Sequence, residues 1–199
     1  MGVLAPVFSS LLLFSGCAKV SYVLNQGVGQ LKLQNNGQDN DKVLKDPLVK
    51  EKDKEKIRKI GEYKDYFFSY FNQKRTAIYS KTSILKQEAV SYLVIASQYD
   101  EVKAKEEKFP FVGKFPYLGF FDEKDAISHQ KKLELLDYIT WRRPVYAYST
   151  LGYLTDNILS SFFYYNEFDM AEMIFHELFH TVFFIKNEVD LSENIAKFN

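Results

Sequence analysis

Residues 174–180 read Ile-Phe-His-Glu-Leu-Phe-His, and within them His176, Glu177 and His180 form an H-E-x-x-H motif. The apolar residues around the motif predict a long, strongly buried helix from about Asp169 to Ile185. Residues four apart lie on the same face of a helix, so both imidazoles can reach a single zinc ion. Glu177 lies about 100° further round, where it can reach a metal-activated water molecule and accept its proton.

A zinc site of this kind needs a third protein ligand, and Glu193 is the best-placed candidate. It follows Ser192, which we expect to be the N-cap of a second helix. A helix–turn–helix would fold Glu193 back toward His180 and complete a ligand set of two histidines and one glutamate. The rivals are two acidic residues of the intervening turn, Glu188 and Asp190. The alternatives to a metal site are a pair of core-facing histidines and a glutamate that caps a helix at the surface.

The composition narrows the function classes. The chain has 199 residues and a net charge of zero, from 26 Lys+Arg against 26 Asp+Glu. This balance argues against a nucleic-acid partner, because neutralising phosphates requires a basic excess. The residues are 46% hydrophobic and 17% aromatic, which is enough for a packed core. There is one cysteine, so a Cys-rich zinc site is excluded, and the third histidine, His129, is expected on a solvated helix face.

The N-terminus is expected to be a targeting segment. Residues 1–16 contain no charged side chain, and their apolar run is too short to span a bilayer but has the length of a signal-peptide core. The run ends in Ser15-Gly16-Cys17, which resembles the lipobox of bacterial lipoproteins. We therefore expect residues 1–16 to be a signal peptide and Cys17 to carry lipid that holds the protein at a membrane surface. The alternatives are a cleaved secretory signal that leaves a free cysteine, and a hydrophobic N-terminal helix.

The remaining pattern predicts an α+β chain. Residues 17–41, rich in Gln, Asn and Gly, are expected to form the lipidated N-terminus and a flexible tether. Residues 42–199 are expected to form a zincin-like metallopeptidase domain, with a short mixed sheet packed on the long H-E-x-x-H helix and additional helices. The expected elements are one helix, or two with a break near Pro47, over residues 42–59; an aromatic core stripe over 63–71; strands over 89–97 and 145–150; short strands joined by turns over 109–121; a helix over 123–138 capped by Asp122; and a strand or short helix over 156–165.

Several segments together resemble a bacterial family of putative zinc aminopeptidases that carry a lipoprotein signal. The matching segments are Ser15-Gly16-Cys17, residues 109–113 and 116–123, Ala147-Tyr148-Ser149-Thr150-Leu151-Gly152-Tyr153, and residues 174–180. The family pattern closes with Asn-Glu-Ser-Phe-Ala, which places Glu193 at the family's glutamate. The resemblance implies a zinc aminopeptidase with one zinc ion per chain. It also implies that the chain is truncated after the third-ligand glutamate, because relatives continue further.

The sequence thus predicts a lipid-anchored zinc metallopeptidase that trims peptides at the bacterial cell envelope, facing the periplasm. Ala18, after the lipidated cysteine, favours the outer membrane. The predicted substrate-binding residues are on the strand over 145–150: Tyr148, Ser149 and Thr150. Candidates for stabilising the oxyanion are Tyr146, Tyr148 and Tyr153. The alternatives are a truncated or catalytically inactive envelope lipoprotein of the same fold, and a structural anchor without metal.

Overall fold

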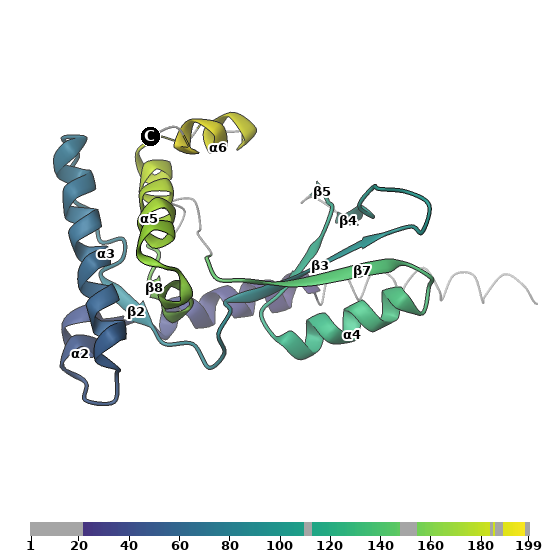
Figure 1. The fold of residues 1–199 in the computed structure, drawn as a ribbon, viewed down its shortest axis with the longest axis horizontal. Helices are drawn as coiled ribbons and strands as arrows, with labels where there is room; N and C mark the ends of the chain where they lie inside the picture. The colour runs from purple at the N-terminus through teal and green to yellow at the C-terminus, as the bar shows by residue number, and fades with distance from the viewer. Residues whose placement is uncertain (1–21, 110–112, 148–154, 184, 186–188, 198–199) are drawn as a thin grey trace, which may run out of the picture. The chain divides into compact units, whose positions relative to one another are not determined.

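The computed structural model describes residues 22–109, 113–147, 155–183, 185 and 189–197. The chain divides into two compact units, each built from two separate segments. The first unit comprises Met1–Lys32 and Ser91–Pro144, and the second comprises Leu33–Val90 and Val145–Asn199. Figure 1 labels most of their helices and strands. The fold is mixed α+β, and we describe the two units separately.

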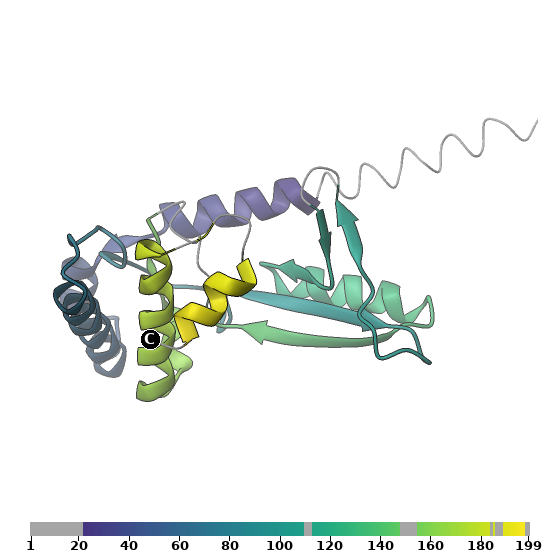
Figure 2. The ribbon, with the colours of Figure 1, turned by 90° about the horizontal axis from the view of Figure 1, so that it is seen from above.

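The first unit contains a three-stranded sheet covered by one helix. The strand order is β6 (Leu118–Phe120), β3 (Ser91–Ser97) and β7 (Ile139–Val145), with β3 and β6 antiparallel. Helix α4 (Glu123–Glu134) packs on β3 and β6, as Figure 2 shows. A second antiparallel pair consists of β4 (Glu107–Phe109) and β5 (Gly113–Phe115).

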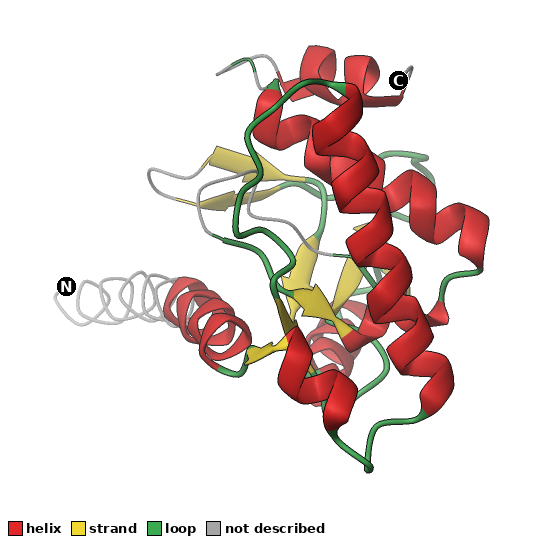
Figure 3. Cartoon of the chain, turned by 90° about the vertical axis from the view of Figure 1, so that its left-hand side faces the viewer, coloured by secondary structure: helices red, strands yellow, loops and turns green. Residues whose placement is uncertain are grey.

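The second unit is mostly helical (Figure 3). Its helices are α2 (Asn40–Lys45), α3 (Glu51–Tyr70), the 3-10 helix η1 (Ser160–Tyr164), α5 (Glu167–Val182) and α6 (Val189–Lys197). A small mixed sheet joins β1 (Gln38–Asp39), β2 (Lys81–Ser83) and β8 (Ile158–Leu159), with β1–β2 antiparallel and β2–β8 parallel. The H-E-x-x-H motif therefore lies in this unit, on α5.

The core of the second unit forms where α3 packs against α5, and the two helices lie side by side in Figure 1. The buried residues repeat at helical spacing on both partners: Ile57, Ile60 and Phe67 on α3, and Met170, Ile174 and Leu178 on α5. Burying a side chain of this size stabilises the fold by about 1.5–3 kcal/mol. The ring of Phe175 also lies between α3 aromatics, 5.9 Å from Tyr63 and 6.3 Å from Phe67. This packing fixes the helix that carries both motif histidines.

Many of the predicted elements are confirmed. Residues 42–59 contribute to two helices, α2 and α3, with Pro47 in the break between them. Helix α3 also contains most of the aromatic stripe, of which Phe67 and Phe68 are in the core whereas Tyr66 and Tyr70 are exposed. The strand over 89–97 corresponds to β3, and the turn-rich segment contains β5 and β6. Asp122 caps α4 by accepting a hydrogen bond from the backbone of Lys124 at 2.8 Å. The segment over 156–165, predicted as strand or helix, contains both β8 and η1.

The structure does not show a tether between residues 22 and 35, because these residues are helical. In the first unit, the Tyr22 hydroxyl and the Gln26 amide donate to the carbonyl of Gly119 at 2.8 and 3.0 Å. Gly29 lies against the ring of Phe121, where an added Cβ would stand 2.1 Å from a ring carbon. A glycine that composition alone marks as flexible is thus a close packing position.

The second unit holds residues 33–37 through a buried amide. The Asn157 side chain donates to the carbonyls of Leu33 and Gln34 and to the Ser83 hydroxyl, at 3.1–3.3 Å. A Cβ on Gly37 would lie 2.4 Å from the same amide nitrogen. These contacts order a polar segment that cannot bury apolar surface of its own.

Three further boundaries differ from the sequence prediction. The strand expected over 145–150 is instead β7, which ends at Val145, and residues 148–150 lie outside the described residues. Helix α4 ends at Glu134 rather than 138, and Asp137 follows with a left-handed φ of 61°. Ser192 is not an N-cap, because α6 begins three residues earlier at Val189. In the described part of the chain, no helix combines the length and apolarity needed to cross a membrane.

Candidate metal centre

Helix α5 begins at a reciprocal cap that explains where the motif helix starts. Asn166 accepts a hydrogen bond from the backbone of Asp169 at 2.9 Å, and its amide donates to the Asp169 carboxylate at 2.7 Å. Such caps satisfy backbone donors that lack a partner in the first turn. The helix then runs to Val182, which places His176 and His180 on successive turns of one face.

Helix α6 is fastened to the end of α5 by a buried hydroxyl. Ser192 is completely buried, and its Oγ accepts a hydrogen bond from the backbone N–H of Ile185 at 3.1 Å. Glu193 is the next residue, so this bond sets the position of its side chain relative to α5. Helices α5 and α6 pack against each other in the second unit, with α6 across the end of α5 (Figure 1).

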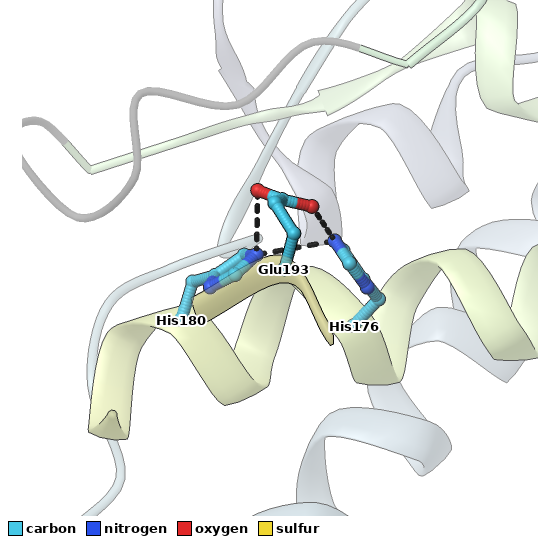
Figure 4. Close-up of side chains that lie close together, drawn as sticks. All are labelled: His176, His180 and Glu193. Atoms are coloured by element: carbon cyan, nitrogen blue, oxygen red, sulfur yellow. Dashed lines mark hydrogen bonds and ion pairs between the residues drawn. The ribbon is translucent and has the colours of Figure 1, made fainter. Parts of the chain in front are cut away.

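The side chains of His176, His180 and Glu193 converge, as Figure 4 shows. The two Nε2 atoms lie 3.1 Å apart. One oxygen of Glu193 lies 3.1 Å from Nε2 of His176, and the other lies 3.2 Å from Nε2 of His180. His180 is buried, whereas the other two are half-buried. These three residues could hold a metal ion, since one ligand atom from each lies within 4.8 Å of the others.

The spacing of the donor atoms is compatible with a divalent metal such as zinc. Two nitrogen ligands bound tetrahedrally at about 2.0–2.1 Å from a zinc ion stand about 3.3 Å apart. The observed separation of 3.1 Å between the Nε2 atoms is close to that value. Two imidazoles and one carboxylate are also a ligand set that catalytic zinc sites use, with a fourth position left for water or substrate.

The environment of His180 keeps its imidazole neutral. Burial lowers the pKa of His180 below its usual 6.5; the nearby Glu193 carboxylate opposes this shift, and His176 adds to it. A neutral imidazole has a lone pair available for a metal, whereas a protonated one has none. At neutral pH the buried ligand is therefore in its binding form.

Glu177 extends the site toward a buried tyrosine. One of its carboxylate oxygens is buried. Burial raises the pKa of Tyr79 well above 10, and the negative charges of Glu177 and Asp156 raise it further. The Tyr79 backbone has a left-handed φ of 55°, which is strained for a bulky residue. It is held by bonds from its N–H to the carbonyl of Asp156 and from the Asn40 amide to its own carbonyl, at 2.8 and 2.9 Å. Sequence patterns gave no indication of this residue.

Most of the other predicted site residues fall outside the part of the chain that the structure describes. Cys17, the substrate-strand residues Tyr148, Ser149 and Thr150, and also Tyr153 and Glu188, lie outside the described residues, as does the side chain of Asp190. Tyr146 is described, and its ring stacks on that of Tyr164 at 5.6 Å. His129 belongs to the first unit, where it is half-buried with its ring 5.2 Å from that of Phe120, rather than fully solvated.

A pocket beside the centre was not predicted from the sequence. It has a volume of about 290 Å³, and α3, α5 and α6 line it together with His176. Its walls include Phe71, which was expected in the aromatic core stripe, and Phe175, which was expected among the buried apolar residues of the motif helix. One sequence feature could have indicated part of this pocket: the four-residue spacing of Phe168, Glu172 and His176, which puts them on one helix face.

Comparison with known proteins identifies one family. No curated protein matches the sequence, and no solved structure matches the fold. The family model described as putative aminopeptidase matches residues 21–199, which include the three converging residues and Glu177. By this match, the chain belongs to the putative aminopeptidase family.

Proposed function

We propose that the protein is a zinc-dependent metallopeptidase with a zincin-like site, acting as an aminopeptidase on peptides at the bacterial cell envelope. The observation that carries this proposal is the convergence of His176, His180 and Glu193 on one point, with Glu177 in the same motif. Family membership supports aminopeptidase activity. No described feature favours the inactive alternative.

Each residue has a distinct task in this proposal. His176 and His180 would hold the metal through their ring nitrogens, and Glu193 would hold it through its carboxylate. The chemistry that zinc supplies when bound is polarisation of the scissile carbonyl and a lowered pKa, about 7, for water. The Glu177 carboxylate accepts a proton from the attacking water and passes it to the leaving amine. Burial of His180 limits access of bulk water to this ligand.

The metal content of the purified chain tests the ligand set. We expect one zinc ion per chain by atomic emission spectroscopy. The His176→Ala variant should lose stoichiometric zinc, whereas Glu193→Ala should bind it more weakly, because two ligands on one helix remain. Full-strength zinc binding by Glu193→Ala, with loss in a Glu188→Ala variant, would move the third ligand to Glu188.

Hydrolysis tests the activity separately. We expect the zinc-loaded chain to release the first residue of unblocked peptides, and a chelator to stop the reaction. Zinc binding without any peptide hydrolysis would instead support the inactive lipoprotein.

The membrane anchor is a further part of the proposal, and it rests on Cys17 in the lipobox-like segment. Because the acyl chains would be the attachment, Cys17→Ser should release the protein from the membrane fraction or leave it unprocessed. A Cys17→Ser protein that fractionates with membranes as the parent does would contradict the anchor.

A further inference from the structure

Four side chains follow one another at four-residue intervals along α5: Phe168, Glu172, His176 and His180. This spacing places them on one face of the helix. Glu172 therefore lies one turn before the first histidine of the metal centre, about 5.4 Å along the helix axis. Its side chain is exposed, and no described cation forms an ion pair with it. The metal face of α5 thus continues into an acidic group that the proposed zinc chemistry does not use.

The pocket of about 290 Å³ opens beside this stripe, and Glu172 and His176 both line it. Its walls include Phe67 of α3 and Phe71, which caps the C-terminal end of α3. Helix α5 supplies Phe175 and Phe179, and α6 supplies Ala196 and Lys197. With Phe168, five aromatic rings make these walls predominantly apolar. A volume at the small end for ligand pockets suits one bulky side chain rather than several residues of a peptide.

We propose that this pocket receives the side chain of the amino-terminal residue of the substrate, and that Glu172 binds the free ammonium group of that residue. The preferred substrates are then peptides with an unblocked, bulky apolar first residue. This inference rests on the proposed aminopeptidase function, because it names the substrate of the same site.

The geometry of an amino-terminal residue agrees with this assignment. Its ammonium nitrogen and its carbonyl oxygen are only about 3 Å apart. A residue with its carbonyl at the metal centre can therefore present its ammonium to a carboxylate one helical turn away. Its side chain then has the aromatic pocket beside it, which His176 lines. The Lys197 ammonium at the pocket wall disfavours lysine and arginine side chains by like-charge repulsion.

Binding of amino-acid amides tests the inference without any turnover. The probes are L-phenylalaninamide, L-alaninamide and N-acetyl-L-phenylalaninamide, titrated calorimetrically into chelator-treated protein and into zinc-loaded Glu177→Gln protein. We expect L-phenylalaninamide to bind about tenfold or more tightly than either other probe in both preparations, since one lacks the ring and one lacks the charge. Equal affinity for the phenylalanine and alanine amides, or for the free and acetylated amines, overturns the inference.

Two variants assign the contacts, each with a matched control. Glu172→Gln should lower affinity for L-phenylalaninamide to that of the acetylated probe, whereas Glu62→Gln, at an exposed glutamate of α3 away from the pocket, should not. Phe168, which is 76% exposed, tolerates truncation, and Phe168→Ala should reduce the preference for phenylalanine over alanine. Tyr99→Ala, at an exposed aromatic residue of the first unit, is its control.

The outcomes separate this inference from the proposed function. Retained binding preferences without hydrolysis by the zinc-loaded parent chain would reject the peptidase and keep the pocket assignment. Hydrolysis that does not distinguish first residues, or that Glu172→Gln leaves unchanged, would reject the pocket assignment and keep the peptidase. A Phe168→Ala change in oligomeric state without a change in probe binding would mark the pocket as a contact between copies and overturn the inference.

Discussion

Glu177 is the residue of the motif whose proposed role is to move a proton rather than to bind metal. Glu177→Gln keeps the size of the side chain and removes the base. We expect zinc content to stay at the parental level while peptide hydrolysis falls by roughly two to four orders of magnitude. Parallel metal analysis and peptidase assays check this, and hydrolysis by Glu177→Gln at the parental rate would rule out the mechanism.

Because of the buried phenol of Tyr79, we expect the free energy of unfolding to fall at alkaline pH. Its phenol is buried, and its folded-state pKa lies well above 10. Below pH 10 the phenol is neutral in both states. Above pH 10 it ionises first in the unfolded chain, so the free energy of unfolding falls by up to about 1.4 kcal/mol per pH unit.

We therefore expect Tyr79→Phe to show a shallower loss of stability than the parent between pH 10 and 11. Urea unfolding at a series of pH values measures this. Tyr70→Phe, at an exposed position of α3, should follow the parental profile. Identical alkaline slopes for the parent and Tyr79→Phe would show that the phenol of Tyr79 ionises in the folded protein as it does in the unfolded one.

At the residue scale, the sequence was enough to predict candidate metal ligands whose spacing along the chain is fixed, as in the H-E-x-x-H motif. The two histidines lie together because the i, i+4 spacing of α5 imposes their geometry, and Glu193 reaches them from α6. Tyr79 and Glu172 could not be predicted, because their significance depends on tertiary neighbours. The environment of Tyr79 comes from burial beside Glu177, and that of Glu172 from a pocket to which α3 and α6 contribute.

At the element scale, the joint between α5 and α6 depends on Ser192. Removing its hydroxyl leaves the Ile185 N–H without its acceptor and loosens the placement of Glu193. We expect Ser192→Ala to weaken zinc affinity by roughly tenfold or more, as loss of a group that orients a ligand commonly does. Competition titration with a chelating dye measures the affinity. Asn194→Ala, an exposed neighbour on the other side of Glu193, should bind zinc as the parent does.

Elements with strong helical periodicity could be predicted from the sequence, and those with mixed composition could not. Helices α3 and α5 repeat apolar residues every three or four positions, and each buries them. Strand β7 contains Arg142, Arg143 and Pro144, which are unusual strand residues. Arg142 is accommodated by an ion pair with Glu123 and a contact with the ring of Tyr92 at 5.7 Å. Proline is tolerated because β7 is an edge strand.

At the scale of the whole molecule, the metal centre and its pocket lie entirely in the second unit. The segment Ser91–Pro144 interrupts that unit, and the residues on either side of it meet, since the Val90 N–H donates to the carbonyl of Val145 at 2.9 Å.

We expect a chain of residues 33–90 and 145–199, joined by a short Gly-Ser linker, to bind one zinc ion. Zinc analysis and circular dichroism check this, with His176→Ala in the same shortened chain as the negative control. A shortened chain that folds but binds no zinc would contradict the assignment of the centre to one unit.

This division could not be predicted from the sequence. Periodicity and turn signals report local structure, whereas each unit combines segments from distant parts of the chain. In the second unit, the two segments are joined by the packing of α3 on α5, by the pairing of β2 with β8, and by single groups such as the Asn157 amide on the carbonyl of Leu33. None of these pairings has a signature in either segment alone.

The packing of α3 against α5 also sets an order of events during biosynthesis. Phe67 and Phe175 are in ring contact in the folded unit but are separated by about a hundred residues of chain. At a synthesis rate of roughly 5–20 residues per second, α3 leaves the ribosome roughly 5–20 s before its partner helix exists. During that interval the apolar stripe of Ile57, Ile60 and Phe67 has no α5 to cover it. The nascent chain therefore presents α3 to chaperones that hold apolar segments, and translation speed across residues 91–144 governs how long that exposure lasts.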